Sequence, residues 1–238
     1  MLNLLIPERR IVLKAIILAA GIGSRLGNPR PKPLTQLSTG EMIMGRQVEY
    51  LQQVVSVDDI MVVVGFKKDL IMEEFSELTY VFNNVYDRTN TSKSLLKALR
   101  KAKYEDVLWL NGDVVFDPAV LGRVVECETS CMAVNTASVA EEEVKYTVAP
   151  DGSIDKVSKI VKNALGESVG INKVIAKDVP LLIDMLDRCE RDDYFERGIE
   201  FAIEEGLKIF PVDVSDVLCI EVDFTEDLAK ANEELGEA

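Results

Sequence analysis

Short, continuous apolar runs recur along this chain, and stretches compatible with amphipathic helices separate them. The run "LKAIILAA" (residues 13–20) ends at a glycine, and "IMVVVGF" (residues 60–66) follows a helix-compatible stretch around residues 45–54. Such runs are typical of strands buried on both faces of a parallel sheet. Residues 13–66 are therefore predicted to form a βαβ unit, which restricts the chain to folds whose helices cover a parallel sheet.

The alternation continues through the next part of the chain. The patterns predict strands at residues 79–84, 106–113 and 131–137, and helices at residues 91–102 and near 118–126. In the first of these helices Leu95, Leu96, Leu99 and Ala102 form one apolar face, and Thr91 or Ser92 is suited to cap its start.

The alternation of strands and helices ends after residue 143. Two strand patterns flank the turn signal "PDG" within residues 144–159 and predict an antiparallel hairpin. Further strands are predicted at 167–177, 207–214 and 218–224, and helices at 178–189, 194–205 and 225–235, the last capped by Thr225. We therefore expect one three-layer α/β domain over residues 1–238, with residues 1–12 as an N-terminal extension. Its mixed, mostly parallel central sheet carries a small antiparallel hairpin lobe.

The charge of the chain argues against some classes of partner. The 238 residues carry a net charge of -14, which disfavours binding to nucleic acid or to an anionic membrane. Residues 1–40 nevertheless hold six Lys or Arg against one Glu, a balance of +5, so the remaining residues sum to -19. A local positive region on an acidic body suits a small anionic ligand.

Histidine is absent from the sequence, which excludes Ser-His-Asp and Cys-His catalysis and zinc sites with histidine ligands. The four cysteines form no Cys-x-x-Cys pair, and the opening "MLNLLIPERR" lacks the pattern of a signal peptide. No apolar run approaches the length of a membrane span. We therefore expect a soluble, cytoplasmic protein with reduced thiols, whose chemistry uses carboxylates, Lys, Arg, hydroxyls or an oxygen-bound metal.

A glycine-rich segment follows the first apolar run, with Gly21, Gly23 and Gly27 in "ILAAGIGSRLGNPRPKPL". Glycines after a strand let main-chain N–H groups approach phosphate oxygens. The dinucleotide fingerprint needs a glycine where this chain has Leu26, and the P-loop pattern is also absent. A dinucleotide-dependent oxidoreductase is therefore disfavoured.

Cations accompany these glycines. Arg25 lies within the segment, and Arg30 and Lys32 follow in "NPRPKPL", where three prolines restrict the backbone. A planar guanidinium and a compact ammonium together can neutralise different oxygens of a triphosphate.

The segment "LAAGIGSRLGNPRPKPL" resembles the signature of the nucleotidyltransferases of the nucleotide-diphospho-sugar transferase superfamily. The similarity extends to "LNGDVVFD" (residues 110–117) and "IEVDFTEDL" (residues 220–228). The segments "YDRTNTSKSL", "ESVGI" and "YFE" are most similar to the phosphocholine cytidylyltransferase-like branch. The resemblance implies a Rossmann-like nucleotidyltransferase fold and the transfer of CMP from CTP to a phosphorylated or phosphonate acceptor.

The same resemblance implies roles for single residues. Lys32 and Arg25 would stabilise the charge of the transition state, and Asp113 and Asp223 would bind Mg²⁺. The implied nucleotide-binding residues are Leu18, Ala19, Ala20, Gly21, Gly23, Ser24, Asn90, Ser94 and Asn111, with Asn83, Asn84 and Asp87 as weaker candidates. The implied acceptor-binding residues are Glu167, Tyr194, Glu196 and Glu221.

Several of these positions have a second interpretation. Helix capping alone explains Thr91 or Ser92, and Tyr194 and Phe195 also fit the apolar face of a helix. Glu221 is expected to face the same side as Asp223, so it is also a candidate for the metal site. Arg30 lies outside the matched motif, and its role stays open.

The acceptor is the least determined part of this interpretation. Choline is disfavoured, because choline-type relatives tend to place tryptophan before the second metal-binding acid, where this chain has "VLCIEVD". An aminoethylphosphonate, a polyol phosphate and a sugar 1-phosphate stay open, as do UTP as the donor and a homodimer as the assembly. Two rival functions are a sugar-1-phosphate uridylyl- or thymidylyltransferase and a non-catalytic nucleotide-binding regulator.

Overall fold

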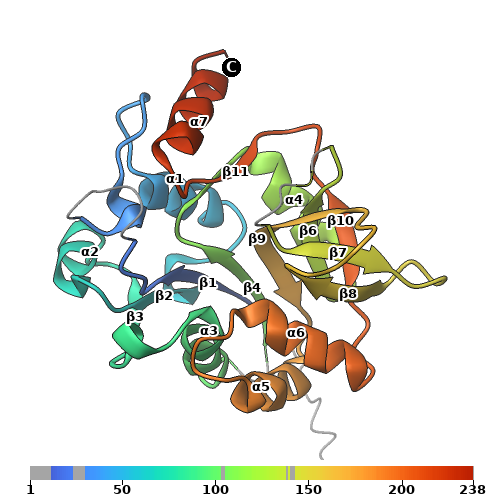
Figure 1. Ribbon diagram of the computed structural model, residues 1–238. Helices are drawn as coiled ribbons and strands as arrows, with labels where there is room; N and C mark the ends of the chain where they lie inside the picture. The colour runs from blue at the N-terminus through green and yellow to red at the C-terminus, as the bar shows by residue number, and fades with distance from the viewer. Residues whose placement is uncertain (1–11, 24–29, 103–104, 138, 140–142, 238) are drawn as a thin grey trace, which may run out of the picture.

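The structure is a computed structural model that describes residues 12–23, 30–102, 105–137, 139 and 143–237 (Figure 1). Its main sheet contains nine strands among these residues. They are β1 (Leu13–Ala19), β2 (Ile60–Val64), β3 (Thr79–Phe82), β4 (Asp106–Asn111), β6 (Cys131–Asn135), β7 (Lys145–Val148), β8 (Ile154–Ser158), β9 (Gly166–Val174) and β10 (Phe210–Asp213).

Strand β1 lies inside this sheet and pairs in parallel with β2 on one side and β4 on the other. The sheet order is β10-β6-β9-β4-β1-β2-β3, and β9 runs antiparallel to both of its neighbours, so the sheet is mixed. The chain extends from β1 towards β3 and then returns to place β4 on the opposite side of β1. At such a switch point a ligand crevice opens outside the carboxyl ends of the strands.

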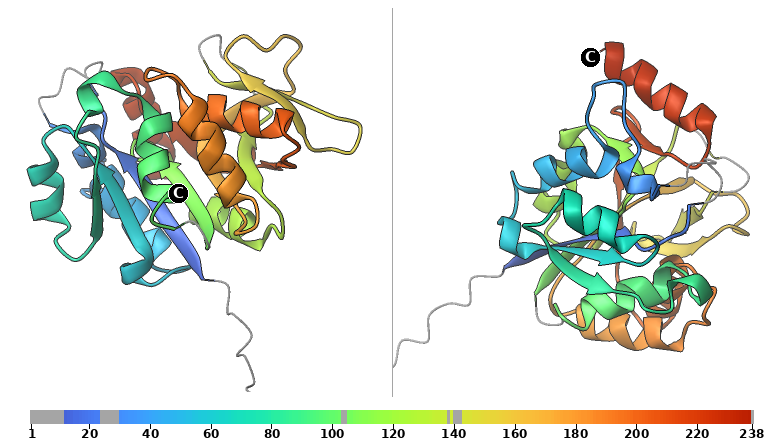
Figure 2. Two further views of the ribbon diagram at one scale, coloured as in Figure 1. Left: turned by 90° about the horizontal axis from the view of Figure 1, so that it is seen from below. Right: turned by 90° about the vertical axis from the view of Figure 1, so that its left-hand side faces the viewer.

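Helices cover both faces of the sheet, as Figures 1 and 2 show. The helices are α1 (Ile43–Leu51), α2 (Lys68–Glu74), α3 (Thr91–Leu99), α4 (Pro118–Glu126), α5 (Val179–Arg188), α6 (Phe195–Glu204) and α7 (Thr225–Glu237), with short 3-10 turns at Lys32–Leu34, Val57–Asp59 and Tyr86–Arg88. Within the described residues, no helix combines the length and apolar character that a bilayer crossing requires.

Alternate residues of β1 contribute to two different hydrophobic cores. Ile16 and Leu18 pack with apolar residues of α3, α5 and α6, whereas Ile17 and Ala19 pack with those of α1, α2 and α4. This alternation explains why residues 15–19 of the strand are all apolar, because both of its faces are buried there. The expected three-layer α/β architecture is confirmed.

A second, two-stranded antiparallel sheet joins β5 (Val114–Phe116) to β11 (Cys219–Glu221). Glu221 pairs with Val114, and the backbone N–H of Val222 donates to the carbonyl of Asp113 at 2.9 Å. Asp113 directly precedes β5, and one residue, Val222, separates Asp223 from the end of β11. The ladder therefore brings these two acids, distant in the sequence, to the same end of the small sheet.

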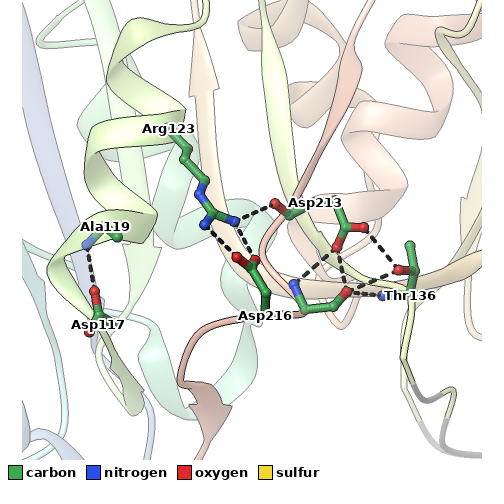
Figure 3. Close-up of polar contacts among 7 residues, drawn as sticks. Asp117, Ala119, Arg123, Thr136, Asp213 and Asp216 are labelled. Atoms are coloured by element: carbon green, nitrogen blue, oxygen red, sulfur yellow. Dashed lines mark hydrogen bonds and ion pairs between the residues drawn. The ribbon is translucent and has the colours of Figure 1, made fainter. Parts of the chain in front are cut away.

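The connection that leads into β11 is held by a polar network on α4 (Figure 3). The Arg123 guanidinium donates to both carboxylate oxygens of Asp216 and, at 3.0 Å, to the backbone carbonyl of Asp213. Thr136 Oγ1 donates to the Asp213 carboxylate at 3.0 Å. These contacts tie the β10–β11 connection to the body of the fold.

The hairpin expected around "PDG" is confirmed, because β7 and β8 pair in an antiparallel manner. Strand β7 also pairs with β9, so the hairpin continues the main sheet. Two elements were missed by the sequence patterns. Helix α2 buries Ile71 alone and therefore shows little periodicity, and β5 is a separate strand that begins directly after the Asp113 turn.

Candidate functional site

A cleft of about 560 Å³ opens at the carboxyl ends of β1 and β4. Fourteen of the residues singled out from the sequence line it together: Leu18, Ala19, Ala20, Gly21, Gly23, Lys32, Asn90, Ser94, Asn111, Asp113, Tyr194, Glu196, Glu221 and Asp223. Glu167 and Arg30 are not among its lining residues. Ser24 and Arg25 lie outside the described residues.

Lys32 begins a 3-10 turn and has a proline on either side. Pro33 is buried, which anchors the turn. The Nζ atom of Lys32 donates to Asp113 Oδ2 at 3.2 Å and to Asp223 Oδ1. Gly23 has a φ of +62°, and a Cβ atom there would lie 2.7 Å from the Cγ atom of Lys32. The glycine therefore leaves room for the Lys32 side chain to reach the two acids.

Three carboxylates converge beside this ammonium. Asp113, Glu221 and Asp223 each offer one oxygen, and these oxygens lie within 4.8 Å of one another. Hard divalent cations prefer carboxylate oxygens, so the donor set fits Mg²⁺. The contacts of Lys32 with Asp113 and Asp223 show that positive charge is favourable at this point. The arrangement therefore suits a divalent cation.

Burial and mutual repulsion change the proton affinity of these groups. Burial raises the pKa of Asp113, and the charge of Asp223 adds to the rise while that of Lys32 opposes it. Burial also raises the pKa of Glu221 well above its ordinary value, with the charges of Asp113 and Asp223 acting in the same direction. Burial alone lowers the pKa of Lys32, but Asp113 and Asp223 outweigh it, so the net pKa is raised and the ammonium stays charged at neutral pH.

The glycine segment and the end of β4 form another wall of the cleft. Gly21 has no atom within 4 Å of the position of an added Cβ, so its backbone faces open space. Asn111 Nδ2 donates to Glu221 Oε1 at 3.4 Å. A Cβ on Gly170, whose φ is +75°, would lie 2.8 Å from the same nitrogen. Gly170 on β9 thus makes room for the Asn111 amide.

The start of α3 forms the opposite wall. Asn90 caps this helix, because its Oδ1 accepts from the Thr91 N–H at 2.8 Å, and its Nδ2 donates to the Asp192 carbonyl at 3.1 Å. Asn83 Nδ2 donates to Ser94 Oγ at 3.1 Å. The cap of α3 is therefore Asn90, so the expectation that Thr91 or Ser92 caps this helix is wrong, and the Asn83 amide holds Ser94 in place.

At the outer end of the cleft, the start of α6 faces the segment around residue 143 and the end of β8. Tyr194 is 43% exposed, whereas Phe195 is buried against Trp109 in an edge-to-face contact. Glu196 is 7% exposed and lines the cleft. The Nζ atom of Lys159 lies 4.9 Å from the centre of the Tyr194 ring.

Several lining residues were not singled out from the sequence. The most chemically significant are Glu143, Lys159 and Asp227. The Asp227 carboxylate accepts from the backbone N–H groups of Asp223 and Phe224 at 3.0 and 2.7 Å, which orients the segment that carries Asp223. The pattern "DFTED" indicated only an acidic helix start, and no local signal marked Glu143 or Lys159.

The comparisons with known proteins agree with this geometry. The family model described as "MobA-like NTP transferase domain" matches residues 15–181. A CMP-5'-(3-aminopropyl)phosphonate synthase of Streptomyces rubellomurinus is 38% identical over 133 residues, which cover 52% of this chain and 21% of that protein. The bifunctional protein GlmU of Methanococcus maripaludis (strain C5) is 35% identical over 202 residues, which cover 82% of this chain and 46% of that protein.

The chain thus spans about a fifth and about half of the lengths of these two relatives. Among solved structures, the CTP:phosphocholine cytidylyltransferase of Streptococcus pneumoniae (LicC) superimposes with a TM-score of 0.75. The superposition covers 94% of this chain and 100% of that one at 21% sequence identity. This likeness confirms the expected nucleotidyltransferase fold.

Proposed function

Because the chain belongs to the family of MobA-like NTP transferase domains, we propose that it transfers CMP from CTP to a phosphorylated or phosphonate small molecule and releases pyrophosphate. One observation carries the proposal: the Lys32 ammonium contacts both Asp113 and Asp223 in the cleft that the glycine segment lines. The name of the Streptomyces relative supports both a CMP product and a phosphonate acceptor.

The reaction needs no nucleophile from the protein. An anionic oxygen of the acceptor attacks the α-phosphorus of CTP, a new P–O bond forms, and the bond from the α-phosphorus to the bridging β-phosphate oxygen breaks. The electron pair of that bond leaves with pyrophosphate. Because the acceptor oxygen is already deprotonated near neutral pH, a chain without histidine can support this step.

Lys32 is the residue that we assign to the α-phosphate. Its raised pKa keeps the ammonium charged, and its prolines and buried contacts fix its position before substrate arrives. Preorganised charge of this kind is more effective than a mobile surface lysine. Arg25 is assigned to the same task on the strength of the motif.

Asp113 and Asp223 are the residues that would hold Mg²⁺, with Glu221 beside them. When bound there, Mg²⁺ supplies positive charge next to the phosphate oxygens of the nucleotide. We assign the backbone of Leu18–Gly23 and the amide of Asn111 to the nucleoside end of CTP. Asn90 and Ser94, on the opposite wall of the cleft, are also assigned to binding the nucleotide.

The test is a panel of four nucleoside triphosphates against several acceptors in the presence of Mg²⁺, with pyrophosphate release as the readout. The acceptors are 2-aminoethylphosphonate, phosphoethanolamine, phosphocholine, glycerol 3-phosphate and glucose 1-phosphate. Release with CTP and a phosphonate or phospho-alcohol supports the proposal. A strict requirement for glucose 1-phosphate with UTP or dTTP would establish the sugar-nucleotide alternative, and nucleotide binding without any turnover would establish a regulator.

Asp113→Ala serves as the inactive control in this panel. Asp155→Ala is its matched partner, because Asp155 is an exposed aspartate on β8 that does not line the cleft. Both variants remove one carboxylate, so a loss confined to Asp113→Ala assigns the turnover to this site.

A further inference from the structure

Glu196 is a buried acid with an unused hydrogen-bonding atom. It lies in the first turn of α6, is 7% exposed and lines the cleft. Within the part of the chain that the structure describes, its Oε2 atom has no hydrogen-bond partner, and no Lys or Arg forms an ion pair with it. A buried carboxylate oxygen without a partner is costly, so such an atom is expected to be satisfied by a ligand.

The charges around Glu196 define what that ligand should be. The pKa of Glu196 is raised to about 7, chiefly by burial and also by the charge of Glu143, while a hydrogen bond with its own backbone and the charge of Lys159 oppose the rise. The carboxylates of Glu143 and Glu196 therefore act on one another in this part of the cleft, and a positively charged ligand relieves their repulsion.

Lys159 does not supply this positive charge to Glu196 in the structure. Its ammonium lies over the Tyr194 ring, 4.9 Å from the ring centre, and makes no ion pair with Glu196 among the described residues. The ring face of Tyr194 is therefore already covered by a cation. Phe195 is buried with its ring against Trp109, at a centroid distance of 5.7 Å.

The unpartnered oxygen of Glu196 and the covered ring of Tyr194 distinguish between the possible ligands. A quaternary ammonium has no N–H group and depends on open aromatic faces. A primary ammonium donates three N–H bonds, which suits an unpartnered carboxylate oxygen. A polyol also donates hydrogen bonds, but it leaves the repulsion between Glu143 and Glu196 unchanged.

We propose that the acceptor carries a primary ammonium group at the end opposite its phosphonate or phosphate, and that Glu196 binds this group. The inference rests on the proposed function and specifies its acceptor. In this arrangement the phosphonate end points to Lys32 and the metal-binding acids, and the ammonium end points to the start of α6.

The experiment compares acceptors that differ only at the far end: 2-aminoethylphosphonate, 2-hydroxyethylphosphonate and 2-(trimethylammonio)ethylphosphonate. For the wild-type protein we expect kcat/KM with the amine to exceed that with either analogue by about 10- to 100-fold, the range of a charge-assisted hydrogen bond. This comparison requires no variant. Equal or better turnover of the hydroxyl or trimethylammonium analogue, or of glycerol 3-phosphate, would overturn the inference while leaving the proposed function intact.

Glu196→Gln tests the residue itself. We expect KM for 2-aminoethylphosphonate to rise by about 10- to 100-fold while kcat changes little, and KM for the hydroxyl analogue to change much less. Glu204→Gln is the matched control, because Glu204 lies on the same helix and is exposed. An equal loss with every acceptor would show a structural role and contradict the assignment.

A binding measurement without turnover completes the test. With CTP omitted, 2-aminoethylphosphonate should raise the melting temperature of the wild-type protein and of Glu204→Gln, but not that of Glu196→Gln. An equal shift in all three proteins would place the ammonium elsewhere. Absence of pyrophosphate with every acceptor and nucleotide would instead reject the proposed function, so the two failures are distinguishable.

Discussion

The Nζ atom of Lys32 lies 3.2 Å from Oδ2 of Asp113, although 81 positions separate the two residues in the chain. Both side chains are largely buried, with exposed fractions of 11% and 19%. The lysine therefore offsets the repulsion between Asp113 and Asp223 as well as facing the cleft. A substitution at position 32 is expected to remove positive charge from beside the bound phosphate and to increase the repulsion between the two acids.

Lys32→Ala should lower kcat by about 10² to 10³, the typical effect of removing one preorganised charge from a transition state. Steady-state kinetics with CTP and the preferred acceptor measures the loss, and circular dichroism checks that the variant is folded. Lys156→Ala removes an exposed lysine outside the cleft and should retain full activity. Near-normal turnover by Lys32→Ala would contradict the assignment.

Asp113→Ala and Asp223→Ala should each reduce turnover by at least about 10²-fold, because each removes a carboxylate from the metal-binding set. A second readout is independent of activity. Mg²⁺ alone should raise the melting temperature of the wild-type protein, and this shift should be lost in Asp223→Ala. An unchanged Mg²⁺ shift in that variant would mean that the ion binds elsewhere.

Gly170→Ala should weaken nucleotide binding through Asn111. The new methyl group would lie 2.8 Å from Asn111 Nδ2 and displace it, so KM for CTP should rise several-fold. The positive φ adds a loss of about 1–2 kcal/mol in the free energy of unfolding. Gly152→Ala is the matched control, since its φ is +82° and no atom lies near the added Cβ. Urea unfolding should show a lower free energy of unfolding for both variants, whereas KM for CTP should change in Gly170→Ala alone.

The stability of the protein should depend on pH through Glu196. Its pKa is about 7 in the folded protein against an ordinary value of 4.5. Between these values the folded state holds a proton that the unfolded state has lost, so stability falls as pH rises, by at most about 1.4 kcal/mol per pH unit. The charge of Lys159 favours this ionisation, whereas the charge of Glu143 favours protonation.

Glu196→Gln removes this titration and keeps the shape of the side chain. The variant should therefore gain stability relative to the wild-type protein as pH rises from 4.5 to 7. Urea unfolding at several pH values in that range measures the difference. A constant difference between the two proteins would show that the acid is ionised throughout and would remove the physical reason given for its role.

The central strands and the glycine segment were predictable from the sequence because they depend on local patterns. Residues 15–20, directly before Gly21, are apolar at every position, which follows from burial on two faces. The cationic Lys32 and the acids after β4 and β11 were also identified, since each belongs to a short motif with a distinctive residue type.

Contacts that depend on tertiary pairing were not predictable in this way. Nothing near Gly170 indicates that Asn111 will occupy the space above it, and nothing near Lys159 indicates that it will lie over Tyr194. Asn90 lines the cleft, and nothing near it in the sequence indicates that its side chain also contacts the Asp192 carbonyl. Such roles arise from segments far apart in the chain.

The pairing of β5 with β11 has a consequence for how the protein is made. The glycine segment, Lys32 and Asp113 leave the ribosome early, whereas β11 and Asp223 follow only near the end of synthesis. A nascent chain that stops before residue 219 possesses a phosphate-facing loop but only part of its carboxylate set. On the proposed function, nucleotide transfer is therefore expected only after the last strand has joined the small sheet, and a chain that stops before residue 219 is expected to be inactive.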